Sequence, residues 1–215
     1  MNIITEHIIV KEEELNLTNQ RAVYYDRLRA LILSDVHIGK TAHFRRHGIP
    51  VPDHILQKDL ERLKFLIEYF KVKTVYVVGD LFHAETNSNM KTFKMWLSQF
   101  KDLKMILIKG NHDRQSPHLT ENLNIKVEPS LQLGPFNLLH EPVEKPSKLF
   151  TISGHTHPGV IIKGRGKQKL KLPCYQLTSH QLILPAFSLF TGLNTRTMPK
   201  DAKCFGFTET SIFKI

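Results

Sequence analysis

Residues that can bind a metal ion or transfer a proton gather in five short blocks, each of which ends an apolar run. The runs cover residues 29–35, 74–80, 104–111, 136–141 and 149–155. Their polar ends are "DVH", "GD", "GNHD", a single histidine and "GHTH", which supply Asp35, His37, Asp80, Asn111, His112, Asp113, His140, His155 and His157. One aspartate or histidine at a strand end is usually a cap or a solvated group, but five such blocks in succession indicate a shared site.

The donor types in these blocks predict a site for divalent metal ions. Carboxylate, imidazole and amide groups are present and thiolates are absent, which suits Mn²⁺, Fe, Zn²⁺ or Mg²⁺. The ligands are too many for one catalytic ion that keeps open positions, but they suit two ions that share a bridging carboxylate. Two ions roughly 3.5–4 Å apart can polarise a phosphate and activate a water molecule between them.

The elements that must position these residues are buried strands, because each apolar run is short and rich in β-branched residues. In an open α/β sheet, ligands bind outside the carboxyl ends of the strands, so the five blocks are expected to converge. Helices are predicted over 53–71 and 86–101, where apolar residues recur at intervals of three and four. Further strands are predicted over 4–10, 21–26, 181–187 and 208–215. This order indicates one α/β domain, residues 1–215, with mixed sheets.

The chain is basic, because its 215 residues carry a formal net charge of +10. Such a balance favours acidic partners such as nucleic acid or phosphorylated metabolites. The two cysteines, Cys174 and Cys204, are too few for a disulfide scaffold and predict free thiols in a reducing compartment. The sequence has no signal-peptide core and no apolar run long enough to span a membrane, so we expect a cytoplasmic protein without membrane attachment.

In this order, D-x-H, GD, GNHD, a single histidine and GHxH resemble the motifs of the calcineurin-like metallophosphoesterases. The blocks span residues 35–157. The resemblance implies a four-layer αββα sandwich with two mixed β-sheets and a dinuclear metal site. The segments "SDVHIGKTAHFRRHGIPVP", "GDLFHAE", "GNHDR", "SGHTHPGV" and "GRGKQKLKLPCY" further resemble a narrower bacterial group, the ligase-associated DNA damage response endonucleases. This second resemblance implies a DNA substrate, a link to DNA repair, and functional association with a DNA ligase, a helicase and an exonuclease.

The resemblance also implies a role for each polar residue. One metal ion would be held by Asp35, His37, Asp80 and His157, and the other by Asp80, Asn111, His140 and His155, with Asp80 as the bridge. Mn²⁺ is favoured, with Fe, Zn²⁺ and Mg²⁺ as alternatives. His112 would stabilise the developing charge and protonate the leaving oxygen, Asp113 would orient the His112 imidazole, and Gly110 would let the chain turn sharply before them. His140 lies in "HEP" and lacks the preceding glycine of the family pattern.

Basic residues outside these blocks leave several interpretations open. Substrate phosphate could be bound by His43, Arg45, Arg46 and Arg114. The alternatives are a solvated loop for the first three and pairing with a neighbouring carboxylate for Arg114. His83 could line the cleft near the metals or be a loop histidine. Residues 163–171 are predicted to form a hairpin whose basic residues either follow a nucleic acid backbone or protect a sheet edge.

Three functions fit the sequence. A metal-dependent phosphodiesterase or nuclease that acts on DNA is favoured by the complete set of ligands, the basic charge and the narrower resemblance. An enzyme for a small phosphorylated metabolite, such as a cyclic nucleotide or a nucleotide derivative, would use the same metal site. A non-catalytic member of the family would be expected to have lost ligands, whereas this chain has kept all of them.

Overall fold

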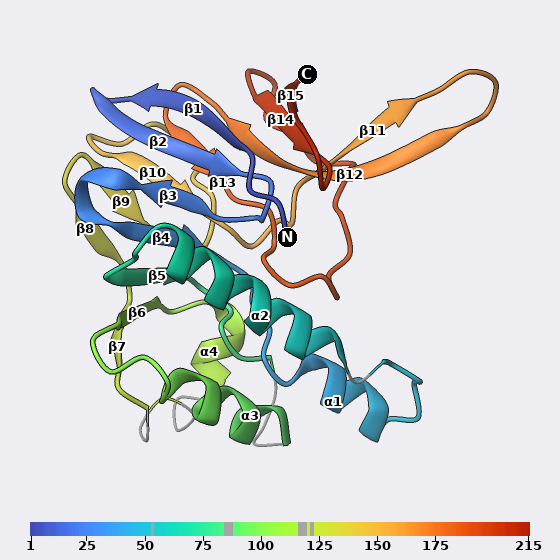
Figure 1. Cartoon of the computed structure of the whole chain (residues 1–215). Coiled ribbons are helices and arrows are strands. Elements are labelled where there is room, and N and C mark those ends of the chain that lie inside the picture. The colour runs from blue at the N-terminus through green and yellow to red at the C-terminus, as the bar shows by residue number, and fades with distance from the viewer. Residues whose placement is uncertain (53, 84–87, 116–119, 121–122) are drawn as a thin grey trace.

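Two β-sheets packed face to face form the centre of the computed structural model, and helices cover one of them (Figure 1). The structure describes residues 1–52, 54–83, 88–115, 120 and 123–215, with the side chains of residues 114 and 115 outside the description. Both sheets contain parallel and antiparallel pairs. The predicted α/β fold with two mixed sheets and flanking helices is confirmed.

The first sheet has seven strands in the order β1 to β7. Its antiparallel part comprises β1 (Thr5–Val10), β2 (Glu13–Thr18) and β3 (Val23–Tyr25). Its parallel part comprises β4 (Ala30–Leu33), β5 (Thr74–Val78), β6 (Lys104–Ile108) and β7 (Ile125–Glu128). Three of the predicted ligand-bearing strands are therefore β4, β5 and β6, whose carboxyl ends lie at the same edge of the sheet because the strands are parallel.

The second sheet has the order β15-β14-β12-β13-β10-β9-β8, and β11 pairs with β12 outside this path. Its strands are β8 (Leu131–Leu133), β9 (Phe136–Leu138), β10 (Phe150–Ser153), β11 (Gly159–Lys163), β12 (Lys169–Leu177), β13 (Gln181–Ile183), β14 (Lys203–Phe207) and β15 (Ile212–Lys214). The other two ligand-bearing strands, β9 and β10, pair in parallel within this sheet.

Two cores hold the layers together. Helices α2 (His54–Tyr69) and α3 (Ser88–Leu97) pack on the outer face of the first sheet, where Leu60 and Phe93 join Leu31 in one apolar cluster. Between the sheets, Ile32 and Ile152 belong to a second cluster. Neighbouring residues of β4 thus enter opposite cores, which is why this strand is apolar throughout.

The shorter helices are a 3₁₀ turn (Asp26–Leu28), α1 (Lys40–Arg46) and α4 (Asn111–Gln115). Helix α1 was not predicted from the sequence, because residues 40–46 show no apolar repeat at helical spacing. The described helices all precede β7, and the described residues after Glu128 form strands and loops. The helical layer expected on the second sheet therefore has no counterpart in the described residues, since the later segments are short runs broken by glycine and proline. No helix within the described ranges is long and apolar enough to cross a membrane.

Candidate metal centre

The predicted ligands lie together where the ends of the two sheets meet. Asp35 and His37 follow β4, Asp80 follows β5, and Asn111 begins α4 shortly after β6. The histidines at 140, 155 and 157 follow β9 and β10 of the second sheet. The five strands do supply one site from their carboxyl ends, but they do so from two packed sheets and not from one open sheet.

Five of the predicted ligands have a left-handed backbone conformation. Their φ angles are 56° at Asp35, 52° at His37, 53° at Asp80, 69° at His155 and 49° at His157. Residues other than glycine rarely adopt a positive φ, and the resulting strain persists only where the surrounding structure enforces it. The concentration of this conformation at the ligand positions supports a functional centre here.

Asp35, His37 and His157 form the first cluster, and their donor atoms lie within 4.8 Å of one another. His157 Nε2 is 3.1 Å from Asp35 Oδ1 and 3.5 Å from His37 Nε2. The other carboxylate oxygen, Asp35 Oδ2, accepts hydrogen bonds from the Ser34 hydroxyl and, at 3.0 Å, from the backbone N–H of His155. These bonds fix the Asp35 carboxylate with Oδ1 toward the histidines.

Asp80, His140 and His155 form the second cluster, with Asn111 beside them. The hydrogen bond between His140 Nδ1 and the Val78 carbonyl, 2.9 Å long, assigns the proton to Nδ1 and directs the Nε2 lone pair into the cluster. His140 Nε2 lies 3.1 Å from Asn111 Oδ1, 3.2 Å from His155 Nδ1 and 3.5 Å from Asp80 Oδ2. His140, which departs from the family pattern in sequence, is therefore in contact with the other predicted ligands.

The chemistry of this donor set fits a metal cation. His140 Nε2 is surrounded by oxygen and nitrogen atoms that carry lone pairs, from Asn111, His155 and Asp80. A positive charge among these atoms would stabilise the cluster. Burial lowers the pKa of His140, but the hydrogen bond with Asp80 and the charge of Asp35 outweigh it and raise the pKa to about 9. Burial likewise raises the pKa of Asp80, but the contact with His140 lowers it to about 2. The carboxylates of Asp35 and Asp80 thus favour a positive charge within the cluster, which a bound divalent ion would supply.

Two glycines make room for the second cluster. Gly79 has a φ of 86°, and a Cβ atom there would overlap His140 Nδ1. Gly110 is not among the positive-φ glycines, so the chain passes from β6 to α4 there without a left-handed conformation. A Cβ atom at Gly110 would overlap the Oδ1 and the backbone nitrogen of Asp80. The glycine before Asp80 and the glycine before Asn111 are therefore required by close packing of the ligands.

His112 lies beside both clusters and is partly accessible. Its backbone N–H donates to Asp80 Oδ1 at 3.0 Å, its Nε2 lies 4.0 Å from Asp80 Oδ2, and 28% of its side chain is exposed. The His83 ring lies against it at 4.5 Å between centroids, and these two form a further group of possible ligands with His37. Burial and the charge of His112 lower the pKa of His83 to about 4. Of the two interpretations of His83, the structure favours the cleft wall.

Asp113 has a different set of contacts from the one predicted. Its Oδ2 accepts the backbone N–H of Asp80 at 2.8 Å and that of Gly110 at 3.0 Å, and its Oδ1 accepts the N–H of Phe82 at 3.1 Å. Both oxygens of this buried carboxylate are thus used to join the loop after β5 to the loop after β6. The role predicted for Asp113, to orient the His112 imidazole, stays a prediction beside this structural one.

Three of the predicted substrate-binding residues lie on helix α1, and they have different surroundings. The His43 ring lies 5.8 Å from the His83 ring, which brings it next to the site. Arg45 Nη1 donates to the Val51 carbonyl at 3.2 Å and so supports the loop after α1, whereas Arg46 is exposed. Phosphate binding by these residues stays a prediction, and the side chain of Arg114 lies outside the described residues.

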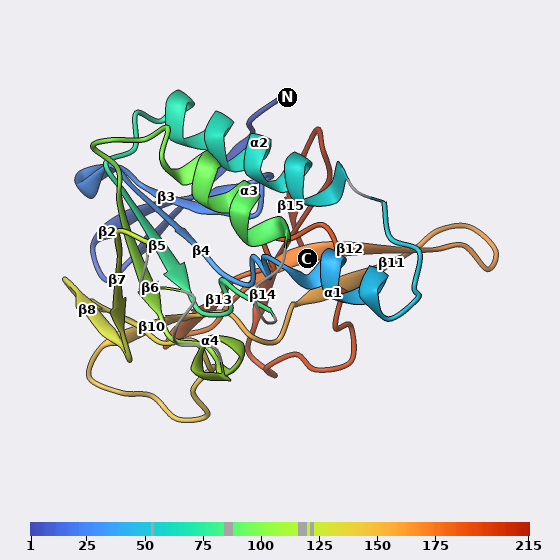
Figure 2. The same cartoon turned by 90° about the horizontal axis from the view of Figure 1, so that it is seen from below.

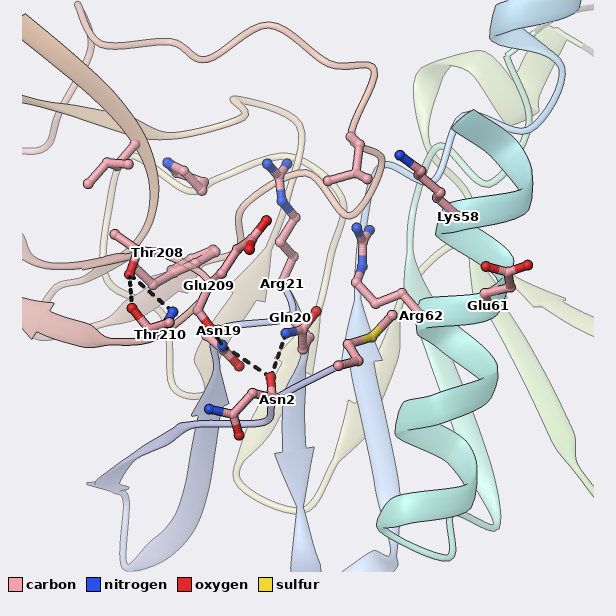
Figure 3. Close-up of a pocket in the computed structure, with 15 residues that line it drawn as sticks. Asn2, Asn19, Gln20, Arg21, Lys58, Glu61, Arg62, Thr208, Glu209 and Thr210 are labelled. Carbon is pink, nitrogen blue, oxygen red and sulfur yellow. Dashed lines mark hydrogen bonds between the residues drawn. The ribbon is translucent and has the colours of Figure 1, made fainter. Parts of the chain in front are cut away.

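A cavity of about 780 Å³ lies away from these ligands, between α2 and the turn that joins β14 to β15 (Figure 3). Arg21 and Arg62 line it together with Lys58 and Glu209. Arg62 pairs with Asp59 at 2.9 Å and also donates to the Phe187 carbonyl, and Arg21 donates to the carbonyls of residues 186 and 188. These guanidinium groups hold residues 186–189, whose amides at 187 and 188 donate to the backbone beside Asp35.

Two mixed sheets with carboxylates and imidazoles gathered at their strand ends define an α/β protein with a candidate metal centre. The family model for calcineurin-like phosphoesterases matches residues 28–183, well over half of the chain. The chain belongs to this family, and the protein is a metal-dependent phosphoesterase.

Among solved structures, the chain is similar to the crystal structure of the Pseudomonas putida nuclease MPE. The identity is 30%, the TM-score is 0.82, and the match covers 99% of this chain and 100% of that one. This similarity fits the narrower endonuclease group that the sequence resembles. Yfce, a phosphoesterase from E. coli, matches at 16% identity with a TM-score of 0.47, covering 86% of this chain and 97% of that one. A comparison with curated protein sequences finds no match.

Proposed function

We propose that this protein is a nuclease that hydrolyses phosphodiester bonds in DNA with the help of two divalent metal ions. The observation that carries the proposal is the pair of ligand clusters beside a partly exposed histidine, His112. The similarity to a nuclease over the whole chain supports a nucleic acid substrate, as does the net charge of +10.

The two clusters suggest how the ions would be held. Asp35, His37 and His157 would bind one ion, and Asn111, His140 and His155 would bind the other, with the Asp80 carboxylate contributing to both. When bound, two such ions would polarise the phosphate oxygens and lower the pKa of a water molecule between them. Mn²⁺ is the ion we propose first, and Fe, Zn²⁺ and Mg²⁺ also suit this donor set.

His112 would act on the substrate as the proton donor. Its backbone N–H is anchored on Asp80, so the residue is held beside the candidate ligands while its side chain stays partly open to solvent. A protonated imidazole there would donate a proton to the leaving oxygen and stabilise the negative charge of the phosphate. His83, packed against the His112 ring, would limit its rotation.

The metal ligands and the proton donor can be separated by two substitutions. We expect His112→Ala to lower kcat by about 10²–10⁴-fold, the usual contribution of a general acid, while two metal ions remain bound. We expect Asp80→Asn to lose metal as well as activity. Elemental analysis of both purified variants beside the wild type measures this, and loss of one ion from His112→Ala would refute the assignment of roles.

The substrate is tested by activity on single-stranded, duplex and plasmid DNA beside bis(p-nitrophenyl) phosphate, with Mn²⁺, Mg²⁺ and Zn²⁺ compared. We expect hydrolysis of the small diester and cleavage of DNA. Turnover of the small diester with every DNA form intact would reject DNA as the substrate. A much higher kcat/KM for a cyclic nucleotide or nucleotide derivative would establish the metabolite alternative.

We further propose a cytoplasmic role in DNA repair, in functional association with a DNA ligase, a helicase and an exonuclease. The support is the resemblance of five sequence segments to the ligase-associated endonuclease group. Deletion of the gene should then raise the sensitivity of cells to DNA damage, and wild-type survival after such damage would contradict this role.

A further inference from the structure

The β11–β12 hairpin projects beyond the sheet from which it comes. β12 pairs with β13 and β14 over residues 174–177. Its earlier residues, 169–173, pair with residues 159–163 of β11. Figures 1 and 2 show the hairpin extending away from the body, at the same end of the molecule as α1. Most of its residues from 161 to 171 are exposed.

The register of the hairpin sorts its side chains onto two faces. Lys163 lies opposite Lys169, and Ile161 lies opposite Lys171. Directly opposed residues of an antiparallel pair point to the same side, and alternate residues of a strand point to opposite sides. One face therefore carries all three strand lysines, while Ile162 opposes Leu170 on the other face.

No acidic residue lies near the cationic face (Lys163, Lys169 and Lys171) in the sequence. From Lys145 to Lys200, both included, the chain has nine Lys and Arg residues and no Asp or Glu. Two of the nine, Arg165 and Lys167, are exposed in the turn of the hairpin. Lysines that only protect a free sheet edge can lie on either face. Their placement on one face points to an extended anionic partner.

The hairpin is joined directly to the metal centre, because β11 begins two residues after His157. Lys171 is paired with Ile161, which is four positions after His157. Lys163 is six positions after His157. At about 3.3 Å per strand residue, these lysines lie about 13–20 Å from that ligand along the axis of the hairpin. DNA advances about 3.4 Å per nucleotide of one strand, so this distance corresponds to roughly four to six nucleotides.

We propose that the cationic face of the β11–β12 hairpin binds the backbone of duplex DNA about four to six base pairs from the scissile phosphate. This inference rests on the proposed DNA substrate and adds to it a docking element outside the metal centre. Binding through Lys163, Lys169 and Lys171 would be independent of base sequence, since lysine contacts phosphate as a point charge.

The test compares two triple variants with the same change in charge. The first is Lys163→Gln/Lys169→Gln/Lys171→Gln. The matched control is Lys71→Gln/Lys73→Gln/Lys104→Gln, three exposed lysines at the amino-terminal ends of β5 and β6, opposite the metal centre. Duplex binding is measured against salt concentration in a His112→Ala background that preserves the DNA. Hydrolysis of bis(p-nitrophenyl) phosphate is measured with His112 intact.

Each lysine lost from a phosphate should reduce the slope of log affinity against log salt by about 0.9. From 50 to 200 mM salt, three such contacts account for about a 40-fold change in affinity. We expect the hairpin variant to lose this part of the salt dependence, to bind duplex more weakly than the control, and to keep full activity on the small diester.

A hairpin variant that matches the control in affinity and slope while DNA is still cleaved would overturn the hairpin proposal alone. Absence of duplex binding by the parent protein, with small-diester turnover intact, would overturn the DNA substrate and the hairpin proposal together.

Discussion

The glycine before Asn111 offers a sharp test of how tightly the metal centre is packed. In Gly110→Ala, the new Cβ would overlap Oδ1 and the backbone nitrogen of Asp80. Non-bonded heavy atoms are best separated by about 3.5 Å, so the Asp80 carboxylate or the start of α4 must move by about 1 Å. Gly110 is not among the residues with positive φ, so the added methyl group acts through this contact and not through backbone strain.

The expected consequences differ between stability and activity. Overpacking of a buried site costs about 1–3 kcal/mol, which should lower the melting temperature by roughly 2–4 °C for each kcal/mol in a chain of this size. A displacement of about 1 Å in a catalytic group can reduce the rate by about 100-fold. We therefore expect a folded protein with about 100-fold lower kcat/KM on bis(p-nitrophenyl) phosphate and weaker binding of metal at the second cluster.

Gly192→Ala is the matched control, because no atom lies within 4 Å of a Cβ built there. The assay combines thermal unfolding, metal content after dialysis and turnover of the small diester at increasing Mn²⁺. Partial recovery of Gly110→Ala at high Mn²⁺, with Gly192→Ala unaffected throughout, is the predicted result. Wild-type activity and metal content in Gly110→Ala would refute the idea that the Asp80 carboxylate must stay where this packing holds it.

Two further predictions follow from the contacts around the site. Asp113→Asn should lower the free energy of unfolding by about 1–3 kcal/mol, because one buried acceptor becomes an N–H donor that faces backbone N–H groups; thermal unfolding checks this, and unchanged stability would argue against the structural role of Asp113. Removal of metal with a chelator should lower stability, because ions that bind only the folded state at 100 times their Kd contribute about 2.7 kcal/mol; an identical melting temperature with and without Mn²⁺ would contradict a site formed by the native fold.

The convergence of the candidate ligands could be predicted because each follows a strong local pattern. An apolar run such as 74–78 has to be buried, and Asp80, two residues after it, then lies at the carboxyl end of a strand. The division into two sheets could not be predicted in this way, because β9 and β10 carry the same short apolar pattern as β4 and β5.

The contacts of Asp113, His83 and Gly110 depend on residues far away in the sequence. Asp113 accepts hydrogen bonds from the loop after β5, and His83 is placed by the rings of His37 and His112. No local pattern encodes such contacts, so sequence spacing predicted residues that the structure brings together but not the backbone hydrogen bonds of Asp113. Helix α1 was missed for a related reason, since its residues contribute few apolar side chains to either core.

In the proposed centre, Asp35, His37 and His157 hold one metal ion, Asn111, His140 and His155 hold a second, and Asp80 lies between them. Anomalous diffraction at the manganese edge from crystals grown with Mn²⁺ tests it most directly. We predict two peaks roughly 3.5–4 Å apart, the usual separation in two-metal sites, with the Asp80 carboxylate between them and His112 bound to neither. A single peak, or a peak coordinated by His112, would contradict this assignment of metal ligands.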